Sequence, residues 1–199
     1  MGFADRTIAD FLDMVARGDP TPGGGAVAAI TGAAGAALGE MVCRLTIENR
    51  AGDSTGTRIA DVRSELSDKR ATLLQLADED SAAVRAVLGG HQGSDWDPAN
   101  SPQRRIVEVP LETAEESLAV LERCVTVAEQ GYAPAIGDAG AGAVLAHACC
   151  RVSIQNVRIN LEHDEGLFDD VEVRAELDNM ENAAERAVAS VQVVVTERT

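Results

Sequence analysis

Residues 20–29 read Pro20-Thr21-Pro22-Gly23-Gly24-Gly25-Ala26-Val27-Ala28-Ala29, and small apolar residues continue from there to Leu38. The prolines restrict the backbone, and the glycines permit conformations that other residues avoid. The pattern predicts a loop that ends at the start of a buried helix. Free N–H groups and the positive end of the helix dipole attract polar or anionic groups there. Two interpretations stay open: Gly23, Gly24 and Gly25 bind a ligand, or they form a tight turn between closely packed backbones.

Beyond this stretch, the spacing of apolar residues is helical along nearly the whole chain. It predicts one all-α domain over residues 1–199, a compact bundle of about six helices. Small residues repeat every four positions in the second helix, which lets helix axes approach closely. We therefore place the second and fifth helices at the centre. The expected helices are 7–18, 26–46, 57–88, one that follows Pro110 and ends at Gly131, 138–161, and one capped by Asp169 or Asp170.

Composition and charge exclude several classes of partner. The chain has 45% hydrophobic but only 3% aromatic residues and a formal net charge of -16. Such an acidic chain has no basic surplus for nucleic acid or an anionic membrane. The sequence lacks an uninterrupted apolar run of membrane-spanning length and an N-terminal signal peptide, so we expect a cytoplasmic protein. The four cysteines and three histidines have no metal-ligand spacing, and we expect buried free thiols and no metal site.

Asp80 falls within an apolar stripe of the third helix. With 100° per residue, it shares a sector with Leu73, Leu76 and Val84, whereas Asp78 and Glu79 point elsewhere. A carboxyl group in such a stripe is hydrogen-bonded, paired or protonated, and burial raises its pKa. Asp80 is therefore a candidate general acid or base. The alternative is a structural hydrogen bond between helices.

The fifth helix repeats this pattern with amides. Asn156 shares an apolar face with Leu145, Ala148, Val152 and Ile159, and Asn160 lies beside it. Buried asparagines need partners, which are either other helices or a ligand. A neighbouring basic stripe of His147, Arg151 and Arg158 either forms salt bridges or receives a carboxylate-bearing ligand.

The first helix is expected to turn Ile8, Phe11, Leu12 and Val15 inward.

Four segments, in order along the chain, resemble motifs of one family of folate enzymes. They are Pro22-Gly23-Gly24-Gly25-Ala26-Val27-Ala28-Ala29, Leu76-Ala77-Asp78-Glu79-Asp80-Ser81-Ala82-Ala83-Val84, Val109-Pro110-Leu111 and Asn156-Val157-Arg158-Ile159-Asn160-Leu161. The chain is identified by them as a member of the formimidoyltetrahydrofolate cyclodeaminase and methenyltetrahydrofolate cyclohydrolase family. The first and last segments are the most specific, and together the four cover nearly the whole chain.

This resemblance implies an all-helical homodimer that binds a tetrahydrofolate derivative near the glycine turn and needs no metal or redox cofactor. It assigns the catalytic aspartate to Asp80. It implies substrate contacts from Gly23 to Gly25, Asp138, Asn156, Asn160 and Arg158. We expect the dimer to form on the small residues Gly32, Gly35 and Gly39.

The chain departs from the family pattern at Gly131-Tyr132, at Gly137-Asp138 and, most clearly, in the loop after the aspartate helix. The family has an Arg-Leu-Pro-Lys loop after the aspartate helix, whereas this chain has Gly89-Gly90-His91-Gln92-Gly93. Arg104 or Arg105 are candidate replacements for the missing lysine. The sequence thus predicts either an enzyme of one-carbon tetrahydrofolates or, alternatively, a non-catalytic helical dimer that binds a folate or another small ligand. Absorbance assays with methenyl- and formimidoyltetrahydrofolate distinguish the two.

Overall fold

The computed structural model describes residues 2–50, 54–89, 101–163 and 166–198. In these ranges it contains helices and no strands, so the predicted all-α class is confirmed. The helices, in chain order, are η1 (Phe3–Asp5), α1 (Ile8–Ala16), α2 (Gly24–Asn49), α3 (Ser54–Leu88), α4 (Pro102–Gln130), η3 (Ala133–Ala135), α5 (Ile136–Leu161) and α6 (Asp170–Arg198).

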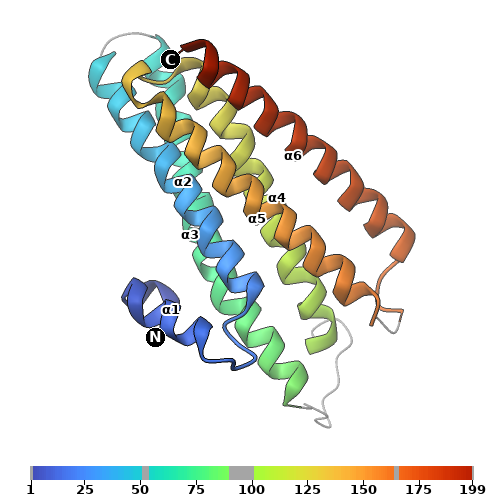
Figure 1. The fold of residues 1–199 in the computed structure, drawn as a ribbon. Coiled ribbons are helices and arrows are strands. Elements are labelled where there is room, and N and C mark those ends of the chain that lie inside the picture. The colour runs from blue at the N-terminus through green and yellow to red at the C-terminus, as the bar shows by residue number, and fades with distance from the viewer. Residues whose placement is uncertain (1, 51–53, 90–100, 164–165, 199) are drawn as a thin grey trace.

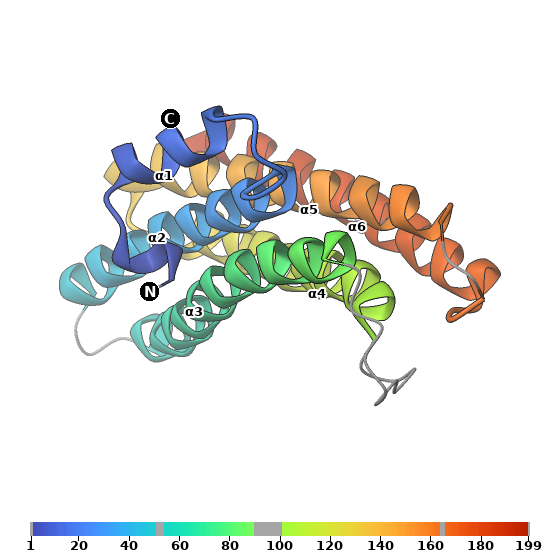
Figure 2. The ribbon, with the colours of Figure 1, turned by 90° about the horizontal axis from the view of Figure 1, so that it is seen from below.

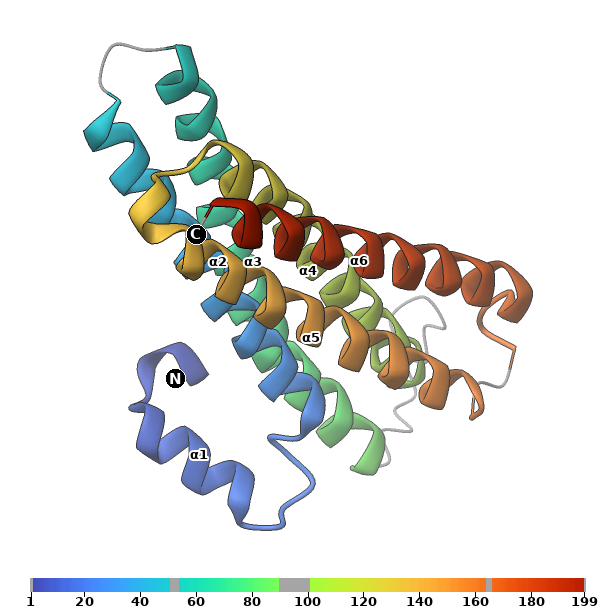
Figure 3. The ribbon, with the colours of Figure 1, turned by 45° about the horizontal axis from the view of Figure 1, so that its top comes forward.

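Helices α2 to α6 form an up-and-down bundle in which each helix runs antiparallel to the one before it (Figure 1). Helix α6 packs along α4 and α5 on one side, and α1 lies apart from the bundle beyond α2 (Figures 2 and 3). Because successive long helices alternate in direction, α2 and α4 begin at the end of the bundle where α3 and α5 finish (Figure 1). That end brings together segments that are far apart in the sequence.

Small residues bring α2 and α5 into close contact at the centre of the bundle, as predicted. A Cβ atom on Gly35 would lie 2.7 Å from the carbonyl oxygen of Gly142, and one on Gly142 would lie 2.9 Å from that of Gly35. Gly32 faces Cys149, and Gly39 faces Leu66, in the same way. The expectation that Gly32, Gly35 and Gly39 form a dimer surface is therefore wrong, because the protein's own core covers them.

The ends of several helices follow their capping residues. The Thr7 hydroxyl accepts a hydrogen bond from the Asp10 amide, as predicted, and Asp169 caps α6 through the amides of residues 171 and 172. Helix α4 differs from the prediction, because it begins at Pro102, after Ser101 as N-cap, and continues through Pro110. Proline is favoured in the first turn of a helix, and both Pro102 and Pro110 could occupy that position. The predicted helix start is at Pro110, whereas the structure places it at Pro102.

Two apolar faces that were expected to point inward are exposed. On α1 only Phe11 is buried, whereas Ile8 is 79% and Leu12 55% exposed. On α5, Val152 and Ile159 are also exposed, and so is Val144, about two turns before Val152. Helical periodicity locates an apolar stripe but does not say what covers it. The outer surfaces of α1 and α5 are therefore apolar and uncovered in the single chain.

Helix α2 has the length and hydropathy of a membrane-spanning helix, with a mean hydropathy of 1.6 over its most apolar 18-residue window. Other helices of the bundle bury 61% of that window, which is typical of a core helix. From sequence alone a spanning helix is not expected, because the apolar run from Ala26 to Leu38 is too short and Glu40 closes it. The four cysteines are buried and form no disulfide, as predicted.

Most of the predicted loop 89–102 falls at residues 90–100, outside the described residues.

Candidate active site at the start of α2

A cavity of about 200 Å³ lies at the end of the bundle where α2 and α4 begin and α3 and α5 finish (Figure 1). Six of the eight predicted site residues line it, and they come from three helices and the turn before α2. The complete lining is Pro20, Gly23, Gly24, Gly25, Asp80, Val84, Ile106, Asn156 and Asn160. The structure thus brings the glycine turn, the aspartate and the two asparagines into one site.

Asp80 lies against the first turn of α2. Its carboxyl group is so close to the Cα atom of Gly25 that a Cβ atom there would lie 2.5 Å from its Cγ atom. The backbone N–H of Ala26 donates a hydrogen bond to the carboxylate. Burial raises the pKa of Asp80 above the ordinary aspartate value, and this hydrogen bond opposes the rise. Asp80 itself thus occupies the start of α2, where free amides were predicted to attract an anionic group.

The segments around Asp80 are held by hydrogen bonds on both sides. Gly23 is the N-cap of α2, and the guanidinium of Arg85 donates to the Thr21 hydroxyl at 3.0 Å. Asp78 accepts a hydrogen bond from the Phe3 amide at 2.9 Å, on a different side of α3 from the cavity. These contacts fix the turn before α2 and the register of α3. They explain why only the third of the three acidic residues at 78–80 reaches the cavity.

The two asparagines face the cavity in different ways. The Asn160 Nδ2 atom donates to the backbone carbonyl oxygen of Ile106 at 2.6 Å. Among the described residues the side chain of Asn156 has no hydrogen-bond partner, so its amide is free to bind a ligand. A second, more apolar cavity of about 260 Å³ adjoins the first and shares Ile106 and Asn160 with it. The site therefore continues from a polar part into an apolar part.

Two predicted site residues lie outside the cavity. Arg158 donates to Asp178 at 2.7 Å and to Glu181 at 2.8 Å, so it joins α5 to α6. Asp138 is exposed in the first turn of α5. It precedes Asn156 by 18 residues of one helix, or about 27 Å at 1.5 Å per residue. Within one chain, neither contributes to the site, and the salt-bridge interpretation of the basic stripe holds for Arg158.

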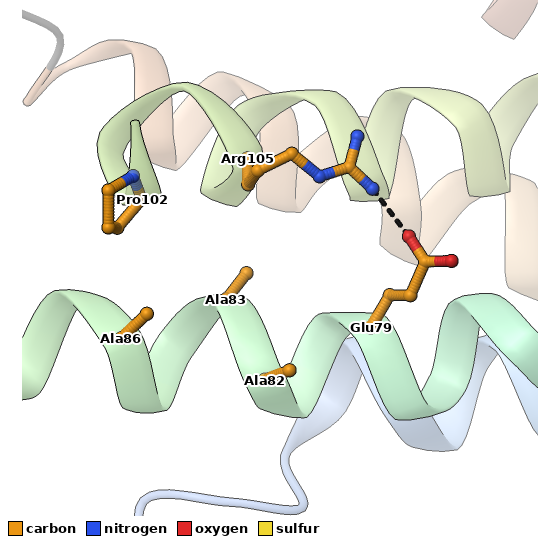
Figure 4. Close-up of a pocket in the computed structure, with 6 residues that line it drawn as sticks. All are labelled: Glu79, Ala82, Ala83, Ala86, Pro102 and Arg105. Carbon is orange, nitrogen blue, oxygen red and sulfur yellow. Dashed lines mark hydrogen bonds and ion pairs between the residues drawn. The ribbon is translucent and has the colours of Figure 1, made fainter. Parts of the chain in front are cut away.

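Arg104 and Arg105 are both engaged by carboxylates. Arg104 pairs with Glu108 at 2.6 Å and lies over the Phe168 ring. Arg105 pairs with Glu79 across a shallow groove between α3 and α4, whose floor contains Ala82, Ala83 and Ala86 (Figure 4). Arg105 also contacts Glu108 and Glu112. The groove thus offers no unpaired positive charge, and the two arginines are not free substitutes for the lysine of the family loop.

Sequence reasoning missed Ile106, which contributes a backbone carbonyl to the site. The signal was present in Pro110, four residues later, because a proline inside a helix leaves the carbonyl group four residues before it without its N–H partner. Chemically, the cavity combines one carboxyl group of raised pKa with amide donors and acceptors. This arrangement suits proton transfer to and from a polar ligand that is held by hydrogen bonds.

Comparisons with known proteins identify the family of the chain. The family model described as formiminotransferase-cyclodeaminase matches residues 7–179. The methenyltetrahydrofolate cyclohydrolase of Methylorubrum extorquens is 34% identical over 165 residues, which cover 78% of this chain and 79% of that protein. The formimidoyltransferase-cyclodeaminase of Rattus norvegicus is 28% identical over 171 residues, or 79% of this chain, and this chain spans only 31% of that protein.

The fold also matches a solved structure. The crystal structure of formiminotetrahydrofolate cyclodeaminase from Thermotoga maritima superposes with a TM-score of 0.87 at 26% sequence identity. The match covers 98% of both chains. The likeness therefore includes every helix of the bundle and the end that carries the cavity.

Proposed function

This chain belongs to the formiminotransferase-cyclodeaminase family, and we propose that it is an enzyme that hydrolyses the methenyl bridge of methenyltetrahydrofolate to give 10-formyltetrahydrofolate. The observation that carries the proposal is the cavity that joins Asp80, of raised pKa, to the start of α2 and to two asparagines. The cyclohydrolase relative, at 34% identity over most of both chains, favours this reaction.

Asp80 is the proposed general acid and base. Its carboxylate accepts a proton from the water that attacks the methenyl carbon, and a tetrahedral intermediate forms. The carboxylic acid then returns a proton to N5 as the carbon–N5 bond breaks, while the new hydroxyl group loses its own proton to solvent and becomes the formyl oxygen. A pKa raised toward neutrality suits a group that takes up and releases a proton in one cycle. Asn156 and Asn160 orient the substrate.

Cyclodeamination is the second candidate reaction. In it, N10 of 5-formimidoyltetrahydrofolate attacks the formimidoyl carbon and loses its proton to the Asp80 carboxylate. The resulting carboxylic acid gives a proton to the departing nitrogen, which leaves as ammonia. The likeness over 98% of the chain to a solved cyclodeaminase favours this candidate. Both reactions have a tetrahedral carbon and proton transfer at nitrogen, so one carboxyl group serves either.

The deciding experiment offers both substrates to the pure protein. Loss of the methenyltetrahydrofolate absorbance, above the uncatalysed rate, supports the cyclohydrolase. Appearance of that absorbance from formimidoyltetrahydrofolate, together with release of ammonia, supports the cyclodeaminase. If neither substrate reacts, while calorimetry detects tetrahydrofolate binding, the enzyme proposal fails and the chain is a folate-binding protein.

We further propose that the protein is a homodimer. The exposed apolar side chains of α1, α2 and α5 include Ile8, Leu12, Met41, Val144 and Val152. Apolar side chains that stay exposed on several helices can be covered by association with another copy. A second copy of the chain is the proposed partner, in place of the buried small-residue contact that the sequence suggested.

A further inference from the structure

Pro110 lies inside α4, where a proline is unfavourable. Its nitrogen carries no hydrogen, so the carbonyl group of Ile106, one turn earlier, has no helical partner. Pro110 and its neighbour Val109 are buried, so the proline is not at a solvent-exposed kink. A proline at such a position needs a compensating contact or a function.

The compensating contact comes from the active site. The Nδ2 atom of Asn160, on α5, donates to the carbonyl oxygen of Ile106 at 2.6 Å. A carbonyl oxygen only accepts hydrogen bonds, so the NH₂ end of the amide must face it. This hydrogen bond determines which end of the Asn160 amide faces Ile106. Without it, the amide could rotate and exchange its two ends. Both Ile106 and Asn160 line the polar cavity and the apolar cavity beside it.

The other end of the Asn160 amide is then available to a ligand. Within the described part of the chain, the Oδ1 atom of Asn160 has no hydrogen-bond partner. It can only accept a hydrogen bond, whereas the unrestrained amide of Asn156 can rotate and present either end. One asparagine of the site is therefore fixed as an acceptor and the other is adaptable.

We infer that Pro110 is a positioning residue that acts through the Ile106 carbonyl group. That carbonyl group holds the Asn160 amide with its Oδ1 atom toward the ligand. Asn160 Oδ1 therefore selects a ligand group that donates an N–H or O–H. If the proposed function is right, the donor is an N–H of the reduced pterin. The inference rests on the proposed function only in naming this donor group. The binding site thus gains an ordered acceptor at the expense of one hydrogen bond in α4.

The test is a set of double-mutant combinations. Pro110→Ala gives α4 the missing N–H, which competes with Asn160 for the Ile106 carbonyl oxygen. We expect the variant to be at least as heat-stable as the wild type, yet to have a KM for methenyltetrahydrofolate raised about tenfold, with a smaller change in kcat. Removing an interior proline does not by itself weaken ligand binding, so a purely structural role predicts no change in KM.

Two backgrounds provide the controls. In Asn160→Ala protein the added Pro110→Ala change should have no further effect on KM, because the side chain that the proline positions is gone. In Asn156→Ala protein, where the altered residue lines the same cavity but does not hydrogen-bond to the Ile106 carbonyl oxygen, the tenfold effect should persist. Equal KM values for wild type and Pro110→Ala, or the same loss in the Asn160→Ala background, would overturn the inference.

A measurement without ligand separates this inference from the proposed function. Side-chain amide signals of Asn160 in ¹⁵N-labelled protein should exchange slowly with water in the wild type and rapidly in Pro110→Ala. Fast exchange in both proteins overturns the positioning role. If exchange differs as expected while no folate binds or reacts, the positioning role stands and the proposed function fails.

Discussion

The carboxyl group of Asp80 lies half-buried against the first turn of α2. Burial raises its pKa, so the folded chain binds the proton of this group more tightly than the unfolded chain does. The stability of the folded state therefore falls as pH rises from the ordinary aspartate pKa through the raised value. At neutral pH the folded state is therefore less stable with Asp80 ionised than it would be with this group protonated.

The first prediction is that Asp80→Asn keeps the fold and removes most of the activity. Loss of a general acid and base costs about 10²–10⁴-fold in rate. The neutral amide avoids the burial of a charge, so thermal unfolding at pH 7 should occur at the wild-type temperature or above it. Circular dichroism and steady-state kinetics measure the two effects. A folded Asp80→Asn protein with wild-type kcat contradicts the catalytic role.

The second prediction concerns the acid limb of the pH profile. If Asp80 must be ionised to accept a proton, kcat/KM should fall as pH decreases through the raised pKa of this carboxyl group. The midpoint should therefore lie above the ordinary aspartate value. A midpoint at or below that value would show that burial does not control the reacting group.

Adjacent glycines provide a matched pair for the third prediction. A Cβ atom on Gly25 would overlap the Asp80 carboxyl group, whereas one on Gly24 would have no heavy atom within 4 Å. Gly25→Ala should therefore displace Asp80 and lower kcat strongly, at a stability cost of about 1–3 kcal/mol from overpacking. Gly24→Ala should leave Asp80 in place and retain most of the activity. Similar kcat values for the two variants would contradict the close packing of Gly25 on Asp80.

At the scale of helices, periodicity predicted the number and order of the long segments and which residues of α3 face inward. Periodicity could not show that Pro110 lies inside α4, because a first-turn proline and an interior proline look alike in sequence. It also could not show that Asn160 of α5 donates to the carbonyl group of Ile106 on α4, because the two residues lie on different helices. Nor could it place Arg158, whose partners on α6 are 20 and 23 residues away. Pairing between helices depends on tertiary packing, which spacing within one helix does not contain.

The fourth prediction tests the close contact of α2 with α5. Gly35→Ala puts a methyl group 2.7 Å from the Gly142 carbonyl oxygen, and backbone cannot move aside as a flexible side chain can. We expect a loss of about 1–3 kcal/mol in the free energy of unfolding. Gly137→Ala, in the first turn of α5 with open space around it, should be neutral or slightly stabilising. Urea unfolding measures both, and equal stabilities would contradict the tight contact.

At the scale of the whole molecule, the bundle separates two kinds of surface. The polar cavity lies at the end of the bundle where α2 begins. Exposed apolar side chains on other parts of the surface include Ile8 and Leu12 of α1, Met41 of α2, and Val144 and Val152 of α5. Asp138 is exposed in the first turn of α5, far from the cavity of its own chain.

The last prediction is that a second copy covers the flank of α5. Val144 is 47% exposed there, and Val171, at the start of α6, is 79% exposed away from this flank. Val144→Glu should bury a charge in the interface and dissociate the dimer, whereas Val171→Glu, the same substitution at another exposed valine, should not. Each copy also carries a formal net charge of -16, so salt should screen the mutual repulsion and tighten the association. Sedimentation equilibrium at two salt concentrations measures both effects, and a wild-type chain that stays at 20.8 kDa at every concentration contradicts the dimer.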